Sequence, residues 1–147
     1  MPSSILIPIA IDHEALVARK LELARRLLDP GGHITLLTVL EAVPSFASEF
    51  VTVKMENHLS ERVRANLDAL ADGDPAFTCV VTTGKAGVKI VEYAARNGID
   101  LVVVGAHHPT AMDYFLGSTA ARVTRRAPCD VYVIRGSAGI GASVAAG

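Results

Sequence analysis

Hydrophobic and polar positions along this chain form two patterns that alternate from one end to the other. Short runs such as residues 34–40 (ITLLTVL) are almost wholly apolar. Runs of this length and composition are typical of strands that are buried on both faces. We predict strands at residues 5–11, 34–40, 77–82, 101–104 and 130–134.

Between these runs, apolar residues recur every three or four positions, as on one face of an amphipathic helix. The first helix should follow a cap at Asp12 or His13, and the Asp-Pro-Gly-Gly sequence at residues 29–32 should end it. We predict helices at residues 16–28, in a long segment that ends near Ala71, at residues 88–96, and from Gly117 to about Arg126.

The alternation of strands and helices predicts an α/β fold with one doubly wound, mostly parallel sheet of five strands and helices on both faces. The flavodoxin-type and Rossmann-type strand orders both fit this pattern. The chain has 147 residues, which suits one domain. We assign this domain to residues 1–136 and expect residues 137–147, which are small and uncharged, to form a flexible tail.

Composition narrows the class of protein further. Half of the residues are hydrophobic and the formal net charge is -1, which offers no electrostatic attraction for nucleic acid or an acidic membrane. No apolar run is long enough to cross a bilayer, and no signal-peptide pattern is present. Cys79 and Cys129 each lie in an apolar segment and are interpreted as buried small hydrophobes, not as a disulfide or a nucleophile. We therefore expect a cytoplasmic protein.

Ligands of doubly wound sheets bind beyond the carboxyl ends of the strands, where neighbouring connections leave in opposite directions. If the first and fourth strands are neighbours there, residues 10–13 and 105–108 line the cleft. Gly105 would let a ligand approach the backbone. Gly117, Ser118 and Thr119 lie where a helix begins, so free N–H groups and two hydroxyls could bind an anion. The alternative is that Ser118 or Thr119 only caps the helix, and without further support that alternative is favoured.

Other candidates are weaker. The pair His107-His108 has no carboxylate or cysteine spaced to complete a metal site. The segment Gly84-Lys85-Ala86-Gly87 lacks the P-loop spacing and is interpreted as a strand-to-helix turn. The basic cluster of the last helix is interpreted as a solvated face; it consists of Arg122, Arg125 and Arg126.

The residues from Gly105 to Thr119 (GAHHPTAMDYFLGST), the opening strand and the closing RAPCDVYVIR at residues 126–135 resemble the universal stress protein (UspA-like) family. The resemblance covers residues 4–135, and the loop before Gly117 is closest to the UspF/UspG branch. It implies a five-stranded parallel sheet of order 3-2-1-4-5. It also implies homodimers that pair their last strands, and ATP, with or without magnesium, in the cleft. Asp113, near the phosphate loop, could approach such a magnesium ion, but we favour its interpretation as a surface carboxylate.

The resemblance also implies roles for individual residues. Pro8 and Ile9 would form an apolar floor, and main-chain groups near Val39 would hold the adenine, with Val104 and Gly105 flanking it. Gly117, Ser118 and Thr119 would hold phosphate. His107 or His108 could donate to phosphate, because His108 replaces the second glycine of the family's loop.

One residue departs from the pattern of the nucleotide-binding members. Nucleotide-binding members have an aspartate at the end of the first strand, where this chain has Ala10. Losing a charged hydrogen bond costs about 1.5–3 kcal/mol, or about tenfold to a hundredfold in affinity, so we expect weakened ATP binding. Asp12 lies two residues further on and could substitute.

Three hypotheses follow. The first is a stress-response regulatory protein that binds ATP, forms a homodimer, acts on an unidentified protein partner and hydrolyses ATP slowly at most, since no positioned base is visible. The second is an interaction module of the same fold that has lost the ligand. The third, a nucleotidyl or phosphoryl transferase, lacks a P-loop.

Overall fold

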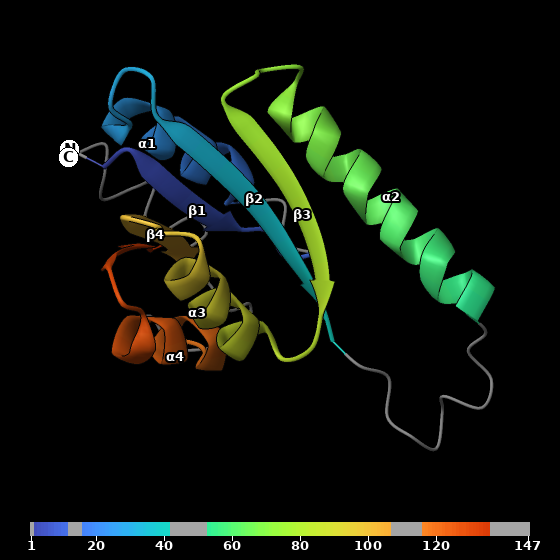
Figure 1. Ribbon diagram of the computed structural model, residues 1–147. Helices are drawn as coiled ribbons and strands as arrows, with labels where there is room; N and C mark the ends of the chain where they lie inside the picture. The colour runs from blue at the N-terminus through green and yellow to red at the C-terminus, as the bar shows by residue number, and fades with distance from the viewer. Residues whose placement is uncertain (1, 12–15, 42–52, 107–115, 136–147) are drawn as a thin grey trace, which may run out of the picture.

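The computed structural model describes residues 2–11, 16–41, 53–106 and 116–135, apart from the side chains of residues 53–56. Within these ranges strands and helices alternate along the chain (Figure 1). The elements are β1 (Ser4–Pro8), α1 (Val17–Leu27), β2 (His33–Leu40), α2 (Val53–Ala71), β3 (Phe77–Thr83), α3 (Ala86–Arg96), β4 (Leu101–Gly105), α4 (Ser118–Arg126) and β5 (Asp130–Ile134).

The strands form one parallel sheet in the order β3-β2-β1-β4-β5. This order confirms the predicted doubly wound α/β fold and decides between the two strand orders that the hydrophobic pattern left open. Alternate residues of β1 face opposite sides of the sheet, because successive side chains of a strand point in opposite directions. Ile5 and Ile7 therefore pack on the side of α1 and α2, whereas Leu6 packs on the side of α3 and α4.

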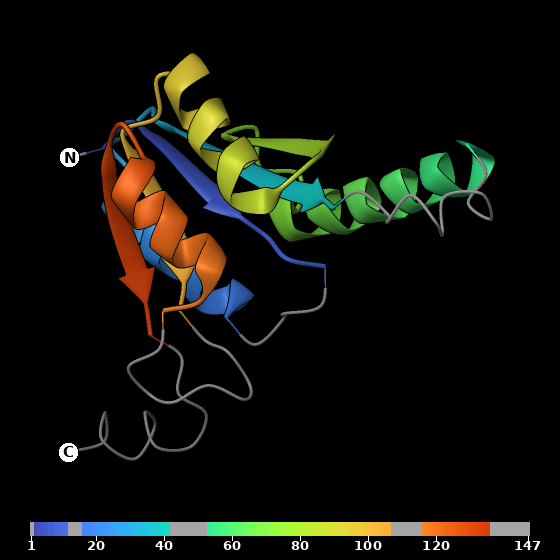
Figure 2. The same ribbon diagram turned by 90° about the horizontal axis from the view of Figure 1, so that it is seen from below.

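The helices cover both faces of the sheet in pairs, as Figure 2 shows from below. Ala24 of α1 and Leu67 of α2 are fully buried against one face. Ile90 of α3 and Val123 of α4 are buried against the other. The three central strands, β1, β2 and β4, are thus held between two apolar layers, which explains their nearly continuous apolar runs in the sequence.

The main differences from the prediction concern two element boundaries and one buried position. β1 ends at Pro8, not at residue 11, because Ala10 and Ile11 are exposed beyond the sheet and Ile11 keeps 53% of its surface. Helix α3 begins at Ala86, two residues earlier than predicted. In α1 the buried stripe contains Lys20, while the apolar Ala18 is exposed.

The predicted helix ends are confirmed by the backbone. Helix α2 ends at Ala71 and is followed by two residues in the left-handed region, Asp72 (φ 51°) and Gly73 (φ 73°). Helix α3 ends at Arg96 and is followed by Gly98 (φ 60°). The predicted cap at Asp12 or His13 and the tail at residues 137–147 lie outside the described residues.

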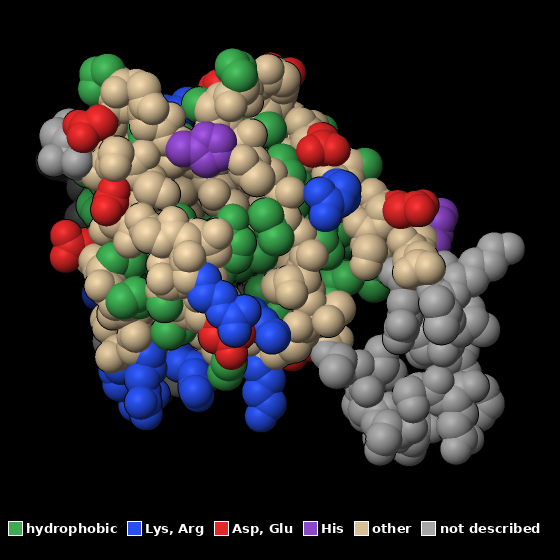
Figure 3. Space-filling view, viewed as in Figure 1, with side chains coloured by type: hydrophobic (Ala, Val, Ile, Leu, Met, Phe, Trp, Pro, Cys, Tyr) green, Lys and Arg blue, Asp and Glu red, His purple; other side chains and the backbone are tan. Residues whose placement is uncertain are grey.

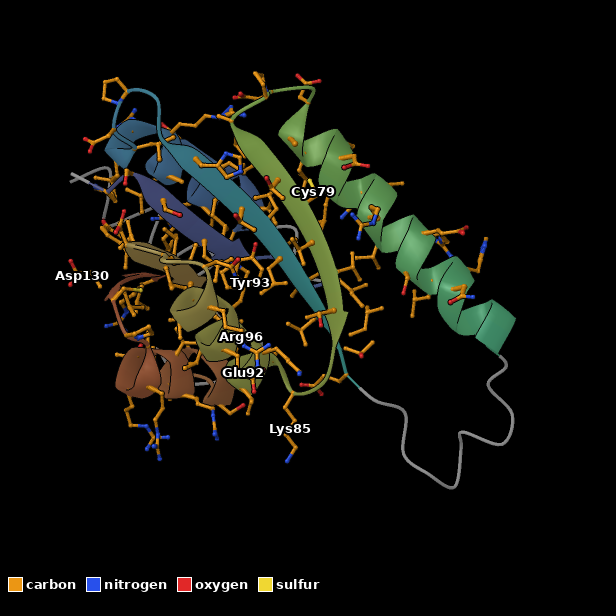
Figure 4. All side chains as sticks on the ribbon, viewed as in Figure 1. Cys79, Lys85, Glu92, Tyr93, Arg96 and Asp130 are labelled. Atoms are coloured by element: carbon orange, nitrogen blue, oxygen red, sulfur yellow. The ribbon has the colours of Figure 1, made fainter. Side chains whose placement is uncertain are left out.

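The cysteines occupy the edges of the core. Cys79 lies in β3, where Figure 4 labels it, and Cys129 immediately precedes β5; both are free and half-buried. Burial and the neighbouring Asp68 raise the pKa of the Cys79 thiol to about 11. A thiol with such a pKa is a poor nucleophile at neutral pH, in keeping with the sequence interpretation. No helix in the described part of the chain is long and apolar enough to cross a membrane.

Candidate functional site

A cleft opens where β1 and β4 separate. These strands pair only at Ile5–Leu101 and Leu6–Val102, near their amino-terminal ends. Beyond these pairs their carboxyl ends enclose a cavity of about 480 Å³, which is within the range of roughly 300–1,000 Å³ that small-molecule sites occupy. This is the position that the switch-point rule predicts for a ligand.

The cavity collects residues from both halves of the chain. Every predicted site residue within the described ranges lines it, namely Pro8, Ile9, Ala10, Val39, Val104, Gly105, Gly117, Ser118 and Thr119. His107, His108 and Asp113 lie outside the described residues. The tertiary structure therefore brings together segments that the sequence analysis could only associate through the expected topology.

Hydrogen bonds to β2 fix the chain just beyond β1. The Ile9 N–H donates to the Leu37 carbonyl oxygen at 2.8 Å. The buried Thr38 hydroxyl donates to the Ile9 carbonyl oxygen, also at 2.8 Å. Ile9 is thus held at the cleft floor by both of its backbone polar groups, and the exposed Ala10 follows at the rim with no carboxylate to offer a ligand.

The amino terminus of α4 forms the opposite side of the cleft. Gly117 is the residue before the helix, no side chain of the described residues caps the helix end, and Ser118 and Thr119 are the first two helical residues. The capping alternative therefore does not describe these residues. The first helical hydrogen bond runs from the Ala121 N–H to the Gly117 carbonyl oxygen, so the preceding N–H groups have no acceptor within the helix. These groups and the helix dipole favour an anion.

Gly105 has a packing role that the sequence analysis did not predict. A Cβ added at this position would lie 2.7 Å from Leu16 Cδ1 and 3.3 Å from Lys20 Cε. The missing side chain therefore makes room for Leu16 and Lys20, which line the same cavity. The backbone of Gly105 still lines the cavity.

Lys20 is the main lining residue that the sequence analysis missed. Its side chain comes from α1, keeps only 8% of its surface, and donates from Nζ to the Pro8 carbonyl oxygen at 3.0 Å. Burial lowers its pKa to about 8. A signal was present: Lys20 lies midway between Leu16 and Ala24 at four-residue spacing, on the stripe that faces the sheet.

The other lining residues that the sequence analysis missed are mostly apolar and form walls of the cavity. Ala86 and Ile90 of α3, Leu37 of β2 and Leu16 line the cavity, and Glu41 lies exposed at its rim after β2. The buried position of Ile90 follows from helical periodicity, but no local pattern shows that it borders a cavity. The apolar walls would suit the flat face of an aromatic ring.

The other sequence candidates are surface features. Residues 84–85 form the turn from β3 to α3, with Gly84 at φ 137°, and Figure 4 shows Lys85 there, directed away from the core. Basic side chains gather along the lower edge of Figure 3, over α3 and α4. Arg122, Arg125 and Arg126 are exposed there, as predicted for a solvated face. Within the described ranges, no group of three His, Cys, Asp or Glu residues could hold a metal ion.

The family comparison agrees with this geometry. The model of the universal stress protein family matches residues 2–135, nearly the whole chain. The chain belongs to the universal stress protein family. Universal stress protein G of Shigella flexneri is 28% identical over 142 residues, which are 92% of this chain and all of that protein, in keeping with the predicted UspF/UspG branch.

Solved structures of the family share the fold. UspA from Lactobacillus plantarum superposes with a TM-score of 0.68 at 24% identity and covers 90% of this chain and 97% of its own. A universal stress protein in complex with cAMP gives 0.60 at 19% identity, covering 90% and 96%. The Archaeoglobus fulgidus protein in complex with dAMP gives 0.61 at 17% identity, covering 89% and 96%. At these identities the likeness shows the fold alone.

Proposed function

We propose that this universal stress protein is a stress-response regulator that binds an adenine nucleotide, ATP in particular, in the cleft between β1 and β4. The observation that carries the proposal is the pairing, in one cavity, of apolar walls with the amino terminus of α4, which no described side chain caps. The complexes of two family members with cAMP and dAMP support the choice of an adenine nucleotide.

Different lining residues would bind different parts of the nucleotide. Pro8, Ile9, Val39 and Val104 would flank the adenine, because they supply the apolar surface near the floor. The N–H groups at the start of α4 would hold phosphate. Nucleotide binding would stabilise one conformation of the protein and so change the surface offered to a protein partner.

A ligand-free interaction module is the second candidate. The observation that favours it is Ala10, which lines the cleft where the resembled nucleotide-binding members carry an aspartate. Such a module would keep the fold and the dimer but would not respond to nucleotide.

One experiment separates the two candidates. Protein purified without added nucleotide is denatured, the released small molecules are identified by mass spectrometry, and the purified protein is titrated calorimetrically with ATP and magnesium. We expect an adenine nucleotide in the released fraction or saturable binding of ATP below millimolar concentration. No nucleotide in the fraction and no heat at millimolar ATP would contradict nucleotide binding and favour the interaction module.

A substitution at the phosphate end tests the location of the site. Gly117→Val should abolish ATP binding, because a branched side chain would occupy the space in front of the free N–H groups. The side chain has room, since no described atom lies within 4 Å of a Cβ at this position. Ser118→Ala is the matched control, because it keeps the backbone donors. Equal affinity of Gly117→Val and wild type, by calorimetry, would place the phosphate elsewhere.

We also infer that the protein forms a homodimer through β5 and acts in the cytoplasm. The dimer is supported by the position of β5 at an edge of the sheet, where one side of its backbone has no strand partner in the described chain. The cytoplasmic location remains a prediction from the sequence.

A further inference from the structure

We propose that Lys20 contacts the ligand directly: its ammonium binds a phosphate oxygen of the nucleotide from the floor of the cleft, as a second anion-binding point opposite the start of α4. The inference rests on the proposed nucleotide function and extends it to a residue of α1. It assigns the cleft to phosphorylated adenine compounds in preference to the free nucleoside.

The position of Lys20 is the first argument. The residue reaches the split between β1 and β4 from below, where its Nζ donates to the Pro8 carbonyl oxygen at 3.0 Å. A Cβ at Gly105 would lie only 3.8 Å from the same Nζ. Lys20 therefore lies between the ends of the two strands that border the cavity and forms part of its lining.

The charge of Lys20 is the second argument. Among the described residues its only hydrogen bond goes to a neutral carbonyl oxygen, and no described carboxylate forms an ion pair with it. A buried ammonium without an anionic partner is costly. An ammonium has three donors, so two remain for an incoming anion.

The described neighbours of Lys20 leave its positive charge available to bind an anion. The described parts of β1, β4 and α4 that line the cavity contribute no titratable side chain, and Glu41 at the rim is the only other ionisable residue of the described lining. On α1 itself, Glu22 is paired with Arg26 at 2.8 Å on the exposed side of the helix. The lowered pKa of Lys20, about 8, has burial as its cause, in agreement with a cation that no described carboxylate neutralises.

Proton linkage provides a specific test. Binding of a phosphate dianion beside Lys20 raises the pKa of its amine, so the complex takes up a proton near pH 8. AMP is the probe, because its phosphate is already a dianion at this pH, and ordinary imidazoles no longer titrate there. AMP and adenosine are titrated into the full chain at pH 8, by calorimetry in buffers of different ionisation enthalpy.

We expect wild type to take up as much as about half a proton per AMP, and none on binding adenosine. Lys20→Met should abolish the uptake and weaken AMP binding about tenfold, while adenosine affinity is retained. Lys89→Met is the matched control: Lys89 is paired with Glu92 on α3 and does not line the cleft, so uptake should persist.

The outcomes are distinct. AMP binding by wild type without proton uptake would overturn the role of Lys20 and leave the proposed function intact, even if Lys20→Met fails to fold. Equal losses of AMP and adenosine affinity in Lys20→Met would also overturn it, because they indicate a structural role. Absence of any AMP or ATP binding by wild type would overturn the proposed function, and this inference with it.

Discussion

At the scale of single residues, Ala10 and Lys20 set the charge of the cleft. Ala10 lies where the family has an aspartate, and Lys20 contributes a buried cation to the floor below it. Under the proposed function, the absent carboxylate would weaken contacts to nucleoside hydroxyls, whereas the lysine would strengthen contacts to phosphate. Both residues would therefore favour recognition of the phosphate over the nucleoside.

Ala10→Asp should tighten binding of adenosine about tenfold, because it restores a charged acceptor for a nucleoside hydroxyl. Ala10 is exposed at the rim, so the added carboxylate needs no burial and the fold should not change. Calorimetric titration with adenosine measures the effect, with Ala10→Asn as the uncharged control. Unchanged affinity in Ala10→Asp would mean that the nucleoside lies elsewhere in the cleft.

Lys20 also makes stability depend on pH. Its pKa falls from the ordinary lysine value of 10.5 to about 8 in the folded protein, so the folded state binds fewer protons than the unfolded chain between these values. Below pH 8 the cost of burying the charge is fully present, and it is relieved as the pH rises from 8 to 10.5. Wild type should therefore gain stability relative to Lys20→Met over this window, by on the order of 2–3 kcal/mol. Urea unfolding of both proteins at pH 7 and pH 10 measures the difference. An equal change in the free energy of unfolding of wild type and Lys20→Met would contradict this prediction.

At the scale of elements, α1 and the ends of β1 and β4 form the base of the site. The hydroxyl of Thr38 on β2 holds the Ile9 carbonyl oxygen, while α1 inserts Leu16 and Lys20 beneath Gly105. At the start of β1 and β4, the Asp100 carboxylate accepts hydrogen bonds from the Ser3 hydroxyl and from the N–H groups of Ser3 and Ser4. These hydrogen bonds, that of the Ser3 hydroxyl most of all, lower the pKa of the Asp100 carboxyl. The two strands are thus tied together at one end and kept apart at the other.

Gly105→Ala tests the contact between α1 and β4. The added methyl group would lie 2.7 Å from Leu16 Cδ1, so the buried Leu16 side chain must shift to admit it. We expect a loss of about 1–3 kcal/mol in the free energy of unfolding, as is typical of overpacked cores. Chemical denaturation measures it, with Gly117→Ala as a control in open space. An unchanged denaturation midpoint would show that α1 adjusts freely.

At the scale of the whole molecule, the two edges of the sheet are protected differently. Helix α2 lies alongside β3 at one edge (Figure 1). At the other edge β5 exposes 45% of Tyr132, next to a groove of about 180 Å³ between α1 and β5. An edge strand with an exposed aromatic side chain is suited to pairing with a second copy.

Tyr132→Asp should therefore shift the protein from dimer to monomer, because it places a charge in each half of the proposed interface. Light scattering coupled to size exclusion at micromolar concentration measures the mass. Leu59→Asp is the control, since Leu59 is another exposed apolar residue (42%) on α2 at the opposite edge. A monomeric wild type, or a dimeric Tyr132→Asp variant, would contradict dimerisation through β5.

The sequence by itself determined the alternation of strands and helices, the helix ends at Ala71 and Arg96, and the end of the sheet at which a ligand would bind. These features follow from local periodicity, from glycines in turns and from a general rule for parallel sheets. The family resemblance further identified the start of α4 as a phosphate site, which remains a proposal. None of this required knowledge of distances between segments.

Only the tertiary structure decided where β1 leaves the sheet, why residue 105 is a glycine and that Lys20 reaches the cleft. Each of these depends on contacts between residues remote in the chain: Thr38 with Ile9, and α1 with the end of β4. A lysine within a helical pattern is normally taken as solvent-exposed, and the packing of α1 beneath the split between β1 and β4 is what buries this one. The periodicity of apolar residues predicts which face of a helix is buried, whereas the packing of the whole chain decides which residues that face contacts.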